Sequence, residues 1–522
     1  MRTSMTDEIT HLRQEVEQLR AKLEQAQAGR SGYYWSPLVQ RDWFNLQHIP
    51  DTGLDREAVK LMVENAHALD FDHRLNTSSY VNVALEQEEE AIALMGLRVN
   101  LADQTVYPQS YKLHDATVNM IANLWHCPQD PEFEDYGVFP GAGTVGSTEA
   151  CLLAGLALKF RWRNWYAKRQ GKTVEQILHA RPNLIISTCF QAAWEKLFKY
   201  MDVEPRLIQP SVKAFTLDPE QVREQIDDQT MGVVCIMGNH YGGHYDPVQE
   251  VSDVIDQVNA ERGYQVGIHV DAASGGFIAP FQDNLPPWDF RVSNVLSISS
   301  SGHKYGESIC GTGWIVWRHR ADLSDHVAIS VSYLGGKAES YTLNFSRPAA
   351  GVYDQYYKLL HYGMSGYRQC CDNMMENARF LRDGLRAMTH VGKPRFTMLD
   401  HGNEGCLPVV TARLNPECEL GYDDVDLQHV LSQHHWYVGS YRMQFDHPLS
   451  GEQLPIFCDA DAESCMFRIV VKSNLTRGMA EHLLESIRVA LDFLDSIAAN
   501  ESPEFDMHHL RHKDQRRFTN HC

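Results

Sequence analysis

Short, continuous apolar runs alternate with longer amphipathic segments between about residues 101 and 320, and this alternation constrains the fold more than any other feature. Such runs are typical of strands buried on both faces, because helices cover both sides of a parallel sheet. Four of them lie at residues 183–188, 231–237, 267–271 and 295–299. We therefore predict an α/β fold with a mainly parallel sheet in a large domain, and functional residues at the carboxyl ends of its strands.

The remaining patterns divide the chain into further parts. An N-terminal helix within residues 1–30 carries the apolar spacing of a coiled-coil seam, or lies on its own subunit, through Ile9, Leu12, Val16, Leu19 and Leu23. An N-terminal arm covers residues 31–100, the large domain 101–360, a smaller α+β C-terminal domain 361–500, and a His-rich tail 501–522. In the C-terminal domain we predict strands near 407–411 and 467–471 and a last helix near 479–498.

The charge of the 522 residues is acidic, with 47 Lys and Arg against 68 Asp and Glu and a net charge of −21. This argues against nucleic acid or an anionic membrane surface as a partner, because both require a basic face. The twelve cysteines include no C-x-x-C pair, so we expect neither a disulfide framework nor a metal site. No stretch reaches the about 18 apolar residues of a membrane span. We predict a soluble, cytoplasmic protein.

A lysine follows the apolar run at 295–299, in the segment Ser299-Ser-Ser-Gly-His-Lys304-Tyr-Gly. A lysine held near the backbone and partly away from water has a lowered pKa and can form a Schiff base with an aldehyde, although an ordinary surface lysine is the alternative. Asp271, at the end of the run at 267–271, weakens that alternative, because a carboxylate at the end of a buried strand needs a cationic partner.

Pyridoxal phosphate would supply an aldehyde for the lysine, a protonated ring nitrogen for the aspartate, and a phosphate. The glycine-rich segment at 141–146, followed by Ser147 and Thr148 at the start of a helix predicted over 149–167, is suited to the phosphate because helix N-termini favour anions. Taken singly, the aspartate and this turn could be ordinary helix caps. Together, the three motifs predict a pyridoxal-phosphate site.

Several segments resemble the group II pyridoxal-phosphate decarboxylases, and most closely the glutamate decarboxylase family. They are Gly146–Ala150, His269–Phe277, Ser301–Lys304, Gly311–Arg318 and Asn344–Pro348. The resemblance runs from about residue 75 to residue 493. It implies a fold-type I, aminotransferase-like architecture. It also implies an obligate homodimer, or a higher homo-oligomer, with sites at the subunit interface.

The resemblance implies roles for individual residues as well. Lys304 is the Schiff-base lysine, Asp271 the partner of the ring nitrogen, and Ala273 and Gln191 lie against the ring. The residues implied at the phosphate are Ser147, Thr148, Ser301 and His303, joined by Phe345 and Ser346 of the neighbouring subunit.

The reaction that the resemblance implies is the α-decarboxylation of an L-amino acid. The substrate amine displaces Lys304 and Arg468 fixes the α-carboxylate, with the bond to that carboxylate perpendicular to the ring. CO2 then leaves its electrons in the ring system, and a proton returns to Cα. Tyr333 is the hypothetical proton donor.

The best single substrate is L-glutamate, because Thr77 and Asn100 occupy the places at which the family binds the distal carboxylate. Two residues depart from the family pattern: Ser78 replaces an aromatic residue, and His240 lies where the family has Gly-Thr-Thr. An imidazole beside the cofactor titrates near neutrality and can hydrogen-bond the ring oxygen or the substrate, unless the backbone satisfies it. A neutral aliphatic amino acid (valine, leucine or methionine) is therefore an alternative substrate.

Three further expectations concern other parts of the chain. The acidic run Glu86, Glu88, Glu89 and Glu90 is typical of a solvated helix face. His521, in the tail, could plug the active site as tails do in some bacterial relatives, or the tail could be a disordered polar segment. Another pyridoxal-phosphate reaction on the same fold, or an inactive scaffold, is the alternative to a decarboxylase. The intact Lys304 and Asp271 argue against the scaffold.

Overall fold

The computed structural model describes residues 16–21, 48–49, 52–129, 139–323, 329–331, 338–402 and 405–499. The chain divides into two compact units, residues 1–71 and 72–522. In the first unit, residues 16–21 are helical, and α2 (Arg56–His67) begins after Asp55, whose carboxylate accepts the free N–H groups of the first turn. Of the predicted heptad seam, Val16 and Leu19 are exposed, and its other members lie outside the described residues. The seam therefore stays a prediction.

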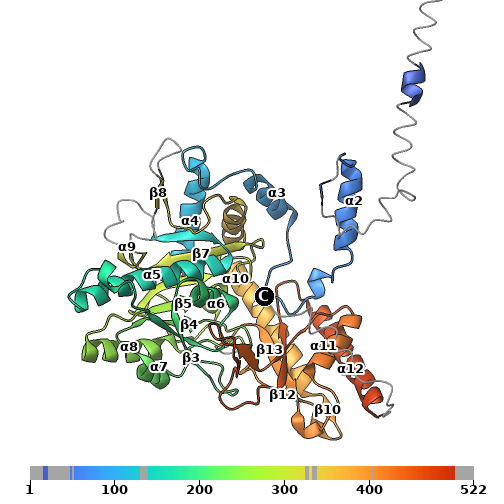
Figure 1. Cartoon of the computed structure of the whole chain (residues 1–522). Coiled ribbons are helices and arrows are strands. Elements are labelled where there is room, and N and C mark those ends of the chain that lie inside the picture. The colour runs from blue at the N-terminus through green and yellow to red at the C-terminus, as the bar shows by residue number, and fades with distance from the viewer. Residues whose placement is uncertain are drawn as a thin grey trace, which may run out of the picture. The chain divides into compact units, whose positions relative to one another are not determined.

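A seven-stranded sheet forms the centre of the second unit, in the order β1-β7-β6-β5-β4-β2-β3 (Figure 1). Neighbouring strands from β6 to β3 pair in parallel, and β7 pairs antiparallel with both β6 and β1. This confirms the mainly parallel sheet. The strands are β1 (Gly141–Val145), β2 (Asn183–Ser187), β3 (Glu204–Ile208), β4 (Thr230–Ile236), β5 (Ile268–Asp271), β6 (Val295–Ser300) and β7 (Thr312–Trp317).

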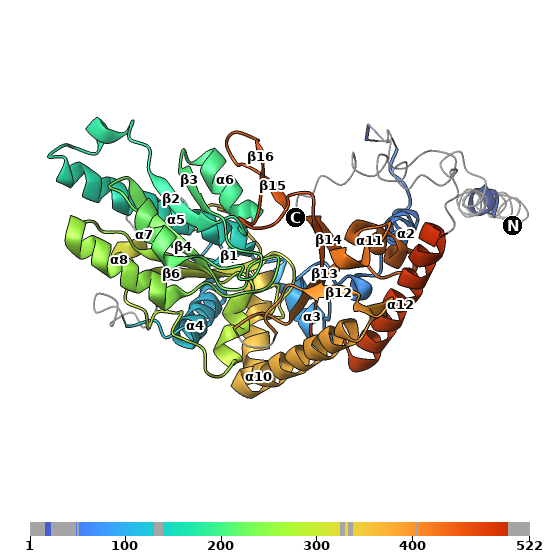
Figure 2. The ribbon, with the colours of Figure 1, turned by 90° about the horizontal axis from the view of Figure 1, so that it is seen from below.

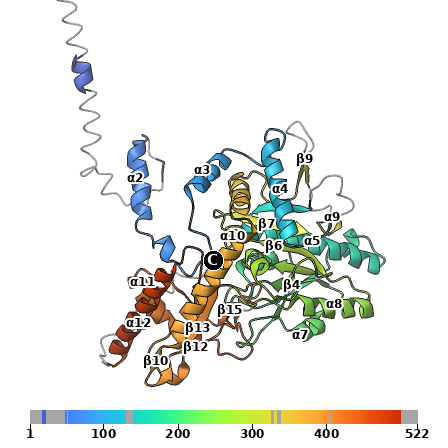
Figure 3. The same cartoon turned by 180° about the vertical axis from the view of Figure 1, so that it is seen from behind.

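Helices cover both faces of this sheet because each central strand is apolar on both sides. Along β4, Val233 and Cys235 pack in one core cluster, and Val234 and Ile236 pack in another. The first face meets α4 (Pro108–Leu124), α8 (Val248–Arg262) and α10 (Ala350–Arg386), as Figure 3 shows from behind. The second face meets α5 (Gly146–Arg169) and α6 (Ala192–Tyr200). The short α7 (Pro219–Gln225) packs on α8.

A second, four-stranded antiparallel sheet forms the smaller C-terminal region, in the order β12-β13-β17-β14. Helix α10 runs along both regions, with a kink at Gly363, and α12 packs beside it (Figure 2). The predicted α/β large region with a smaller C-terminal region is thus confirmed, whereas the boundaries at residues 100 and 360 stay a prediction. The elements of this region are β12 (Phe396–Met398), β13 (Val409–Leu414), β14 (Gly439–Arg442), β17 (Cys465–Val470), α11 (Asp424–Gln433) and α12 (Arg477–Ala499).

One short helix of the N-terminal arm differs from its expected role. Helix α3 (Gln87–Gly96) packs against α10, and Glu89 is fully buried there, so the acidic run is not wholly a solvated face. The expectation was wrong at this position because an ammonium, that of Lys358, lies 2.9 Å from the Glu89 carboxylate. The remaining small elements are α9 (Arg320–Leu323), β8 (Ile329–Val331), β9 (Ala338–Ser340), β10 (Thr389–His390), β11 (Lys393–Pro394), β15 (Gln444–Asp446) and β16 (Gln453–Pro455). Within the described residues, no helix combines the length and apolar character that a membrane crossing would need.

Candidate active site

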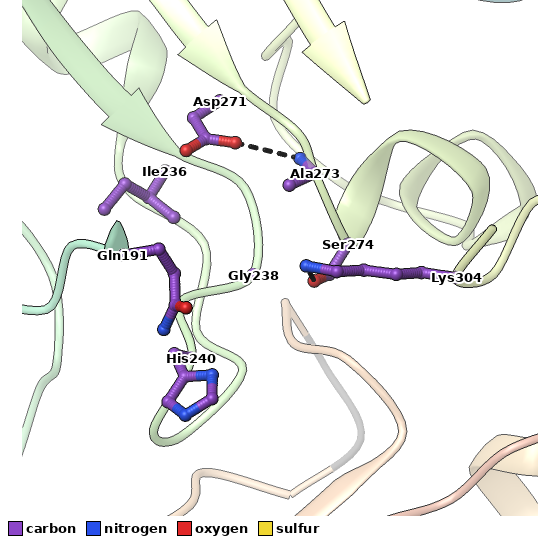
Figure 4. A pocket seen from close by; sticks show the side chains of 8 residues that line it. All are labelled: Gln191, Ile236, Gly238, His240, Asp271, Ala273, Ser274 and Lys304. Carbon is purple, nitrogen blue, oxygen red and sulfur yellow. Dashed lines mark hydrogen bonds between the residues drawn. The ribbon is translucent and has the colours of Figure 1, made fainter. Parts of the chain in front are cut away.

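A small cavity lies at the carboxyl ends of β4 and β5, where a mainly parallel sheet is expected to carry its chemistry (Figure 4). Five residues predicted from the sequence line it together. Gln191 and His240 lie across the cavity from Lys304, and Asp271 lies at its inner end (Figure 4). The eight lining residues are Gln191, Ile236, Gly238, His240, Asp271, Ala273, Ser274 and Lys304.

Asp271 ends β5 and is buried, and two donors hold its carboxylate. The indole N–H of Trp194 donates to Oδ2 at 2.7 Å, and the backbone N–H of Ala273 donates to Oδ1 at 3.0 Å. Among the described residues, no cationic side chain forms an ion pair with this carboxylate. A buried carboxylate that is hydrogen-bonded but not charge-paired is suited to a cationic group on a bound molecule.

Lys304 follows β6 and points its ammonium into the cavity, where it donates to the hydroxyl of Ser274 at 3.1 Å (Figure 4). Burial lowers the pKa of Lys304, and the positive charge of Arg468 adds to this, while the charge of Asp271 opposes it. A lowered pKa increases the share of neutral amine, which is the nucleophilic form of a lysine. The side chain is therefore prepared to bond to a carbonyl carbon.

Small residues and hydroxyl groups gather where α5 begins. Gly146 has a φ of 68°, and a Cβ at this position would lie 3.3 Å from the ring of His303. The hydroxyl of Ser301 donates to that of Ser147 at 2.7 Å, and Thr148 follows in the first turn of the helix. Nδ1 of His303 lies 2.7 Å from the carbonyl oxygen of Thr312. Because a carbonyl oxygen can only accept, this nitrogen carries the proton and donates the hydrogen bond. Free N–H groups, hydroxyls and the helix dipole make this a suitable place for a phosphate.

Arg468 lies at the edge of the site on β17, and its guanidinium is fully buried. It donates to the backbone oxygens of His240 and Ser78 and, at 2.9 Å, to the hydroxyl of Tyr441. Its Nε–H has no partner, and among the described residues no carboxylate is paired with the charge. The ring of Tyr80 lies 4.8 Å from the guanidinium and 5.3 Å from the Lys304 ammonium. A buried cation without an anion is suited to the carboxylate of a substrate.

His240 lines the cavity, but the expectation that it titrates near neutrality was wrong. Burial lowers its pKa far below the ordinary value for histidine, and the positive charges of Arg468 and Lys304 lower it further. The backbone oxygen of His240 accepts from Arg468 and from the hydroxyl of Tyr80 at 3.1 Å, which fixes the loop. The imidazole is therefore a neutral group that faces the cavity beside two cations.

The other predicted residues lie elsewhere. The hydroxyl of Thr77 donates to the backbone oxygen of Tyr437 at 3.2 Å. Asn100 lies with Ser346, 3.4 Å between side chains, and neither lines the cavity of its own chain; Phe345 belongs to the same segment. Tyr333 and His521 lie outside the described residues, so their predicted roles stay predictions.

Sequence reasoning missed four residues that complete the site. Trp194 follows the predicted residue Gln191 by about one helical turn. Ser274 directly follows Ala273 in the motif from which Asp271 and Ala273 alone are predicted. Tyr80 and Tyr441 gave no signal, because each is an isolated tyrosine that reaches Arg468 only after folding.

Comparison with known proteins decides the family. The model described as "Pyridoxal-dependent decarboxylase conserved domain" matches residues 56–404. The chain belongs to the pyridoxal-dependent decarboxylase family. Relatives of this decarboxylase include a glutamate decarboxylase of Petunia hybrida, 34% identical over 86% of this chain and 84% of that protein, and glutamate decarboxylase beta of Listeria monocytogenes, 33% identical over 84% and 88%.

Solved structures agree with this membership. The glutamate decarboxylase of Lactobacillus brevis superposes with a TM-score of 0.79 at 31% identity, over 89% of this decarboxylase and 98% of that chain. A sphingosine-1-phosphate lyase of Burkholderia pseudomallei superposes with a TM-score of 0.68 at 20% identity, over 89% and 97%, and shows the shared fold alone. The chain is thus a carboxy-lyase of fold-type I whose cofactor is pyridoxal 5'-phosphate.

The residues present fit this cofactor. The unpaired carboxylate of Asp271 suits the protonated ring nitrogen, and the amine of Lys304 at the same cavity suits the aldehyde. The hydroxyls of Ser147 and Ser301 at the start of α5 suit the phosphate. The ring nitrogen, the aldehyde and the phosphate of the cofactor are thus each matched by a chemically suitable group of the protein.

Proposed function

We propose that this decarboxylase removes the α-carboxylate of L-glutamate as CO2 and leaves 4-aminobutanoate. The observation that carries the proposal is the buried guanidinium of Arg468, which has no carboxylate partner among the described residues and lies beside the Lys304–Asp271 cavity. Such a charge needs an anion, and the α-carboxylate of an amino acid supplies one. Glutamate is chosen because relatives 33–34% identical over 84–86% of the chain are named glutamate decarboxylases.

Each residue of the site has a defined task in this reaction. Arg468 orients the α-carboxylate, and Lys304, whose lowered pKa favours the neutral amine, would hold the aldehyde of the cofactor. Asp271 is held by Trp194 so that its charge stays at the inner end of the cavity. The cofactor, when bound, supplies an electron sink for the electron pair that CO2 leaves behind.

Tyr333 is our proposed donor of the proton that returns to Cα. Its support is the sequence motif alone, because the residue lies outside the described part of the chain. In Tyr333→Phe we expect slower product formation with a largely unchanged KM, since only the proton transfer is affected. Undiminished turnover by this variant would remove Tyr333 from the mechanism.

A second candidate substrate is a neutral aliphatic amino acid, and two observations favour it. The hydroxyl of Thr77, which the family pattern assigns to the distal carboxylate, already donates its hydrogen bond to the backbone oxygen of Tyr437. The imidazole of His240, which faces the cavity, is kept neutral by burial and two neighbouring cations. Neither group offers a positive charge to a distal carboxylate.

The test is to incubate the holoenzyme with each common L-amino acid and to identify the amine, together with CO2, ammonia and hydrogen peroxide. 4-Aminobutanoate and equal CO2 support the proposal. An amine from valine, leucine or methionine, without 4-aminobutanoate, replaces glutamate by the second candidate. Ammonia or peroxide in place of the amine contradicts a simple decarboxylase.

We also propose that the enzyme works as a homodimer in the cytoplasm. Asn100 and Ser346 lie together but away from the cavity of their own chain, as is required if they serve a neighbouring subunit. None of the eleven cysteines within the described residues forms a disulfide, which suits a reducing compartment. A mass near 59.5 kDa for the active enzyme in solution would contradict the dimer.

A further inference from the structure

A cluster of buried charged residues lies behind the active-site lysine and takes no part in the reaction proposed above. Helix α3 contributes Glu89 and helix α10 contributes Asp354 and Lys358, all with side chains shielded from solvent. The turn after Lys304 adds Glu307, and the segment after β17 adds Lys472. The groups that surround the two carboxyls of α3 and α10 are Glu86, Glu307, Ser308, Lys358, Tyr362, Tyr367 and Lys472.

Glu89 and Asp354 are neighbours in this cluster. Lys358 lies one turn after Asp354 on α10, so both side chains point to the same face of the helix. The ammonium of Lys358 lies 2.9 Å from Oε2 of Glu89, so this ion pair joins α10 to α3. The two carboxyls are close enough to act as hydrogen-bond partners.

One oxygen of each carboxyl lacks a partner. Oε1 of Glu89 and Oδ1 of Asp354 are buried and accept no hydrogen bond, although their other oxygens are satisfied by Lys358 and by the N–H of Ile309 at 2.7 Å. Unsatisfied acceptors on two interacting, buried carboxyls are costly unless the carboxyls share a proton. Glu307 differs, because its Oε2 accepts from Ser473 at 2.6 Å.

The charges of the cluster also require one extra proton. Three buried carboxyls, of Glu89, Asp354 and Glu307, lie with two buried ammoniums, of Lys358 and Lys472. If all five were ionised, the buried cluster would hold an excess negative charge, and Glu86 at its half-exposed edge, 3.8 Å from Lys358, would increase it. One proton makes the buried set neutral.

We propose that Asp354 is protonated in the folded enzyme and donates a hydrogen bond to the ionised Glu89, and that this pair positions the turn that carries Lys304. Asp354 accepts from the N–H of Ile309, and its neighbour Gln355 donates to the carbonyl oxygen of Gly306 at 3.0 Å. Tyr367, also on α10, donates to the same oxygen at 2.8 Å. Helix α10 thus fixes the residues that directly follow Lys304, and the shared proton ties α3 to the same point.

The pair makes stability depend on pH in a defined direction. Burial raises the pKa of Asp354 to about 7 from an ordinary 3.8, and the charge of Glu89 adds to this. A carboxyl whose pKa is raised by folding binds its proton more tightly in the folded chain. Its contribution to stability is therefore full below about pH 4 and is lost as the pH rises through about 7.

Asparagine at position 354 tests the proposal because it imitates the protonated acid. Its amide donates to Glu89 and its oxygen still accepts from Ile309, but it cannot release a proton. We compare the melting temperatures of the native and Asp354→Asn holoenzymes as the pH rises from 5 to 8. We expect the decrease to be smaller for Asp354→Asn. We also expect its infrared spectrum at pH 7 to lack one carbonyl band of a protonated carboxylic acid. Near pH 6 the cofactor absorbance should match that of the native enzyme.

Three variants distinguish the members of the cluster. Glu89→Gln should melt at a lower temperature than Asp354→Asn at neutral pH, because it leaves the buried ammonium of Lys358 without its carboxylate. Glu86→Gln, which removes a neighbouring charge only, and Glu307→Gln should both keep the infrared band. A band that persists in Asp354→Asn, or that disappears in Glu307→Gln instead, overturns the assignment of the proton. An unchanged pH dependence of melting in Asp354→Asn overturns the proposed effect on stability.

Discussion

At the scale of single residues, the indole of Trp194 holds the Asp271 carboxylate, for which we propose the ring nitrogen of the cofactor as partner. Among the described residues, this indole and one backbone N–H donate to the Asp271 carboxylate, and both bonds are directional. Hydrogen bonds to a charged group fix its orientation more strongly than neutral ones do. In the site that we propose, Trp194 is therefore a positioning residue that acts on the cofactor through Asp271.

In Trp194→Phe, we expect the dissociation constant for pyridoxal phosphate to rise about 10- to 100-fold, because a hydrogen bond to a charged group contributes about 1.5–3 kcal/mol. Equilibrium titration of the apoenzyme, followed by visible absorbance, measures this constant. Trp162→Phe is the control, since its indole donates to the backbone of Asp228, away from the cavity. Equal effects of the two substitutions would show that only packing is involved.

His240 allows a prediction about pH. Burial lowers its pKa well below the ordinary 6.5, so the ring is neutral at neutral pH. In His240→Gln we expect the relative kcat/KM for different amino acids to change, while the shape of the pH profile of kcat/KM stays the same. A limb of the profile that vanishes in this variant would show that His240 titrates in the free enzyme.

The sequence predicted the cofactor end of the site better than the substrate end. Asp271 ends a strand of the main sheet and Lys304 and Ser147 each follow one, so local patterns place them at one edge. Arg468, Tyr80 and the backbone of His240 come from three distant segments, and only the packing of the smaller region brings them together. The neutral state of His240 follows from burial between two cations, which no local pattern contains.

At the scale of elements, α10 contains one residue that its helical pattern does not predict. Gly363 has a φ of 56° and a ψ of −172°, which interrupts the helix between the part behind Lys304 and the part beside α12. A conformation of this kind is nearly restricted to glycine.

In Gly363→Ala we expect the free energy of unfolding to fall by about 1–3 kcal/mol, because a side chain disfavours this backbone conformation. Contacts with other parts of the chain add nothing to this cost, since a Cβ here would meet no other residue within 4 Å. Gly478→Ala, in the first turn of α12 with equally open surroundings, is the control and should be neutral or slightly stabilising. Urea denaturation of both variants measures the difference, and equal stabilities would contradict the strain.

At the scale of the whole molecule, the cofactor should act as part of the folded structure. Asp271, Lys304 and the start of α5 are each suited to one group of pyridoxal phosphate, and Asp271 is otherwise left without a counter-charge among the described residues. Anything that binds only the folded state stabilises it by mass action.

Removal of pyridoxal phosphate should therefore lower the melting temperature, and restoring it to 100 times its dissociation constant should add about 2.7 kcal/mol of stability. Scanning calorimetry of apoenzyme and holoenzyme checks this. Pyridoxal without the phosphate is the control, and we expect it to stabilise less, because the hydroxyls of Ser147 and Ser301 then lack their ligand. Equal stabilisation by the two compounds would contradict the phosphate site.

Arg468 joins three parts of the chain at one guanidinium: its own strand β17, the loop of His240, and Ser78 in the N-terminal arm. Through the bond to Ser78, the N-terminal arm helps to hold the guanidinium that we propose for the substrate carboxylate. We therefore expect an enzyme cleaved by a protease just before residue 80 to keep the visible absorbance of its bound cofactor but to bind amino acids more weakly.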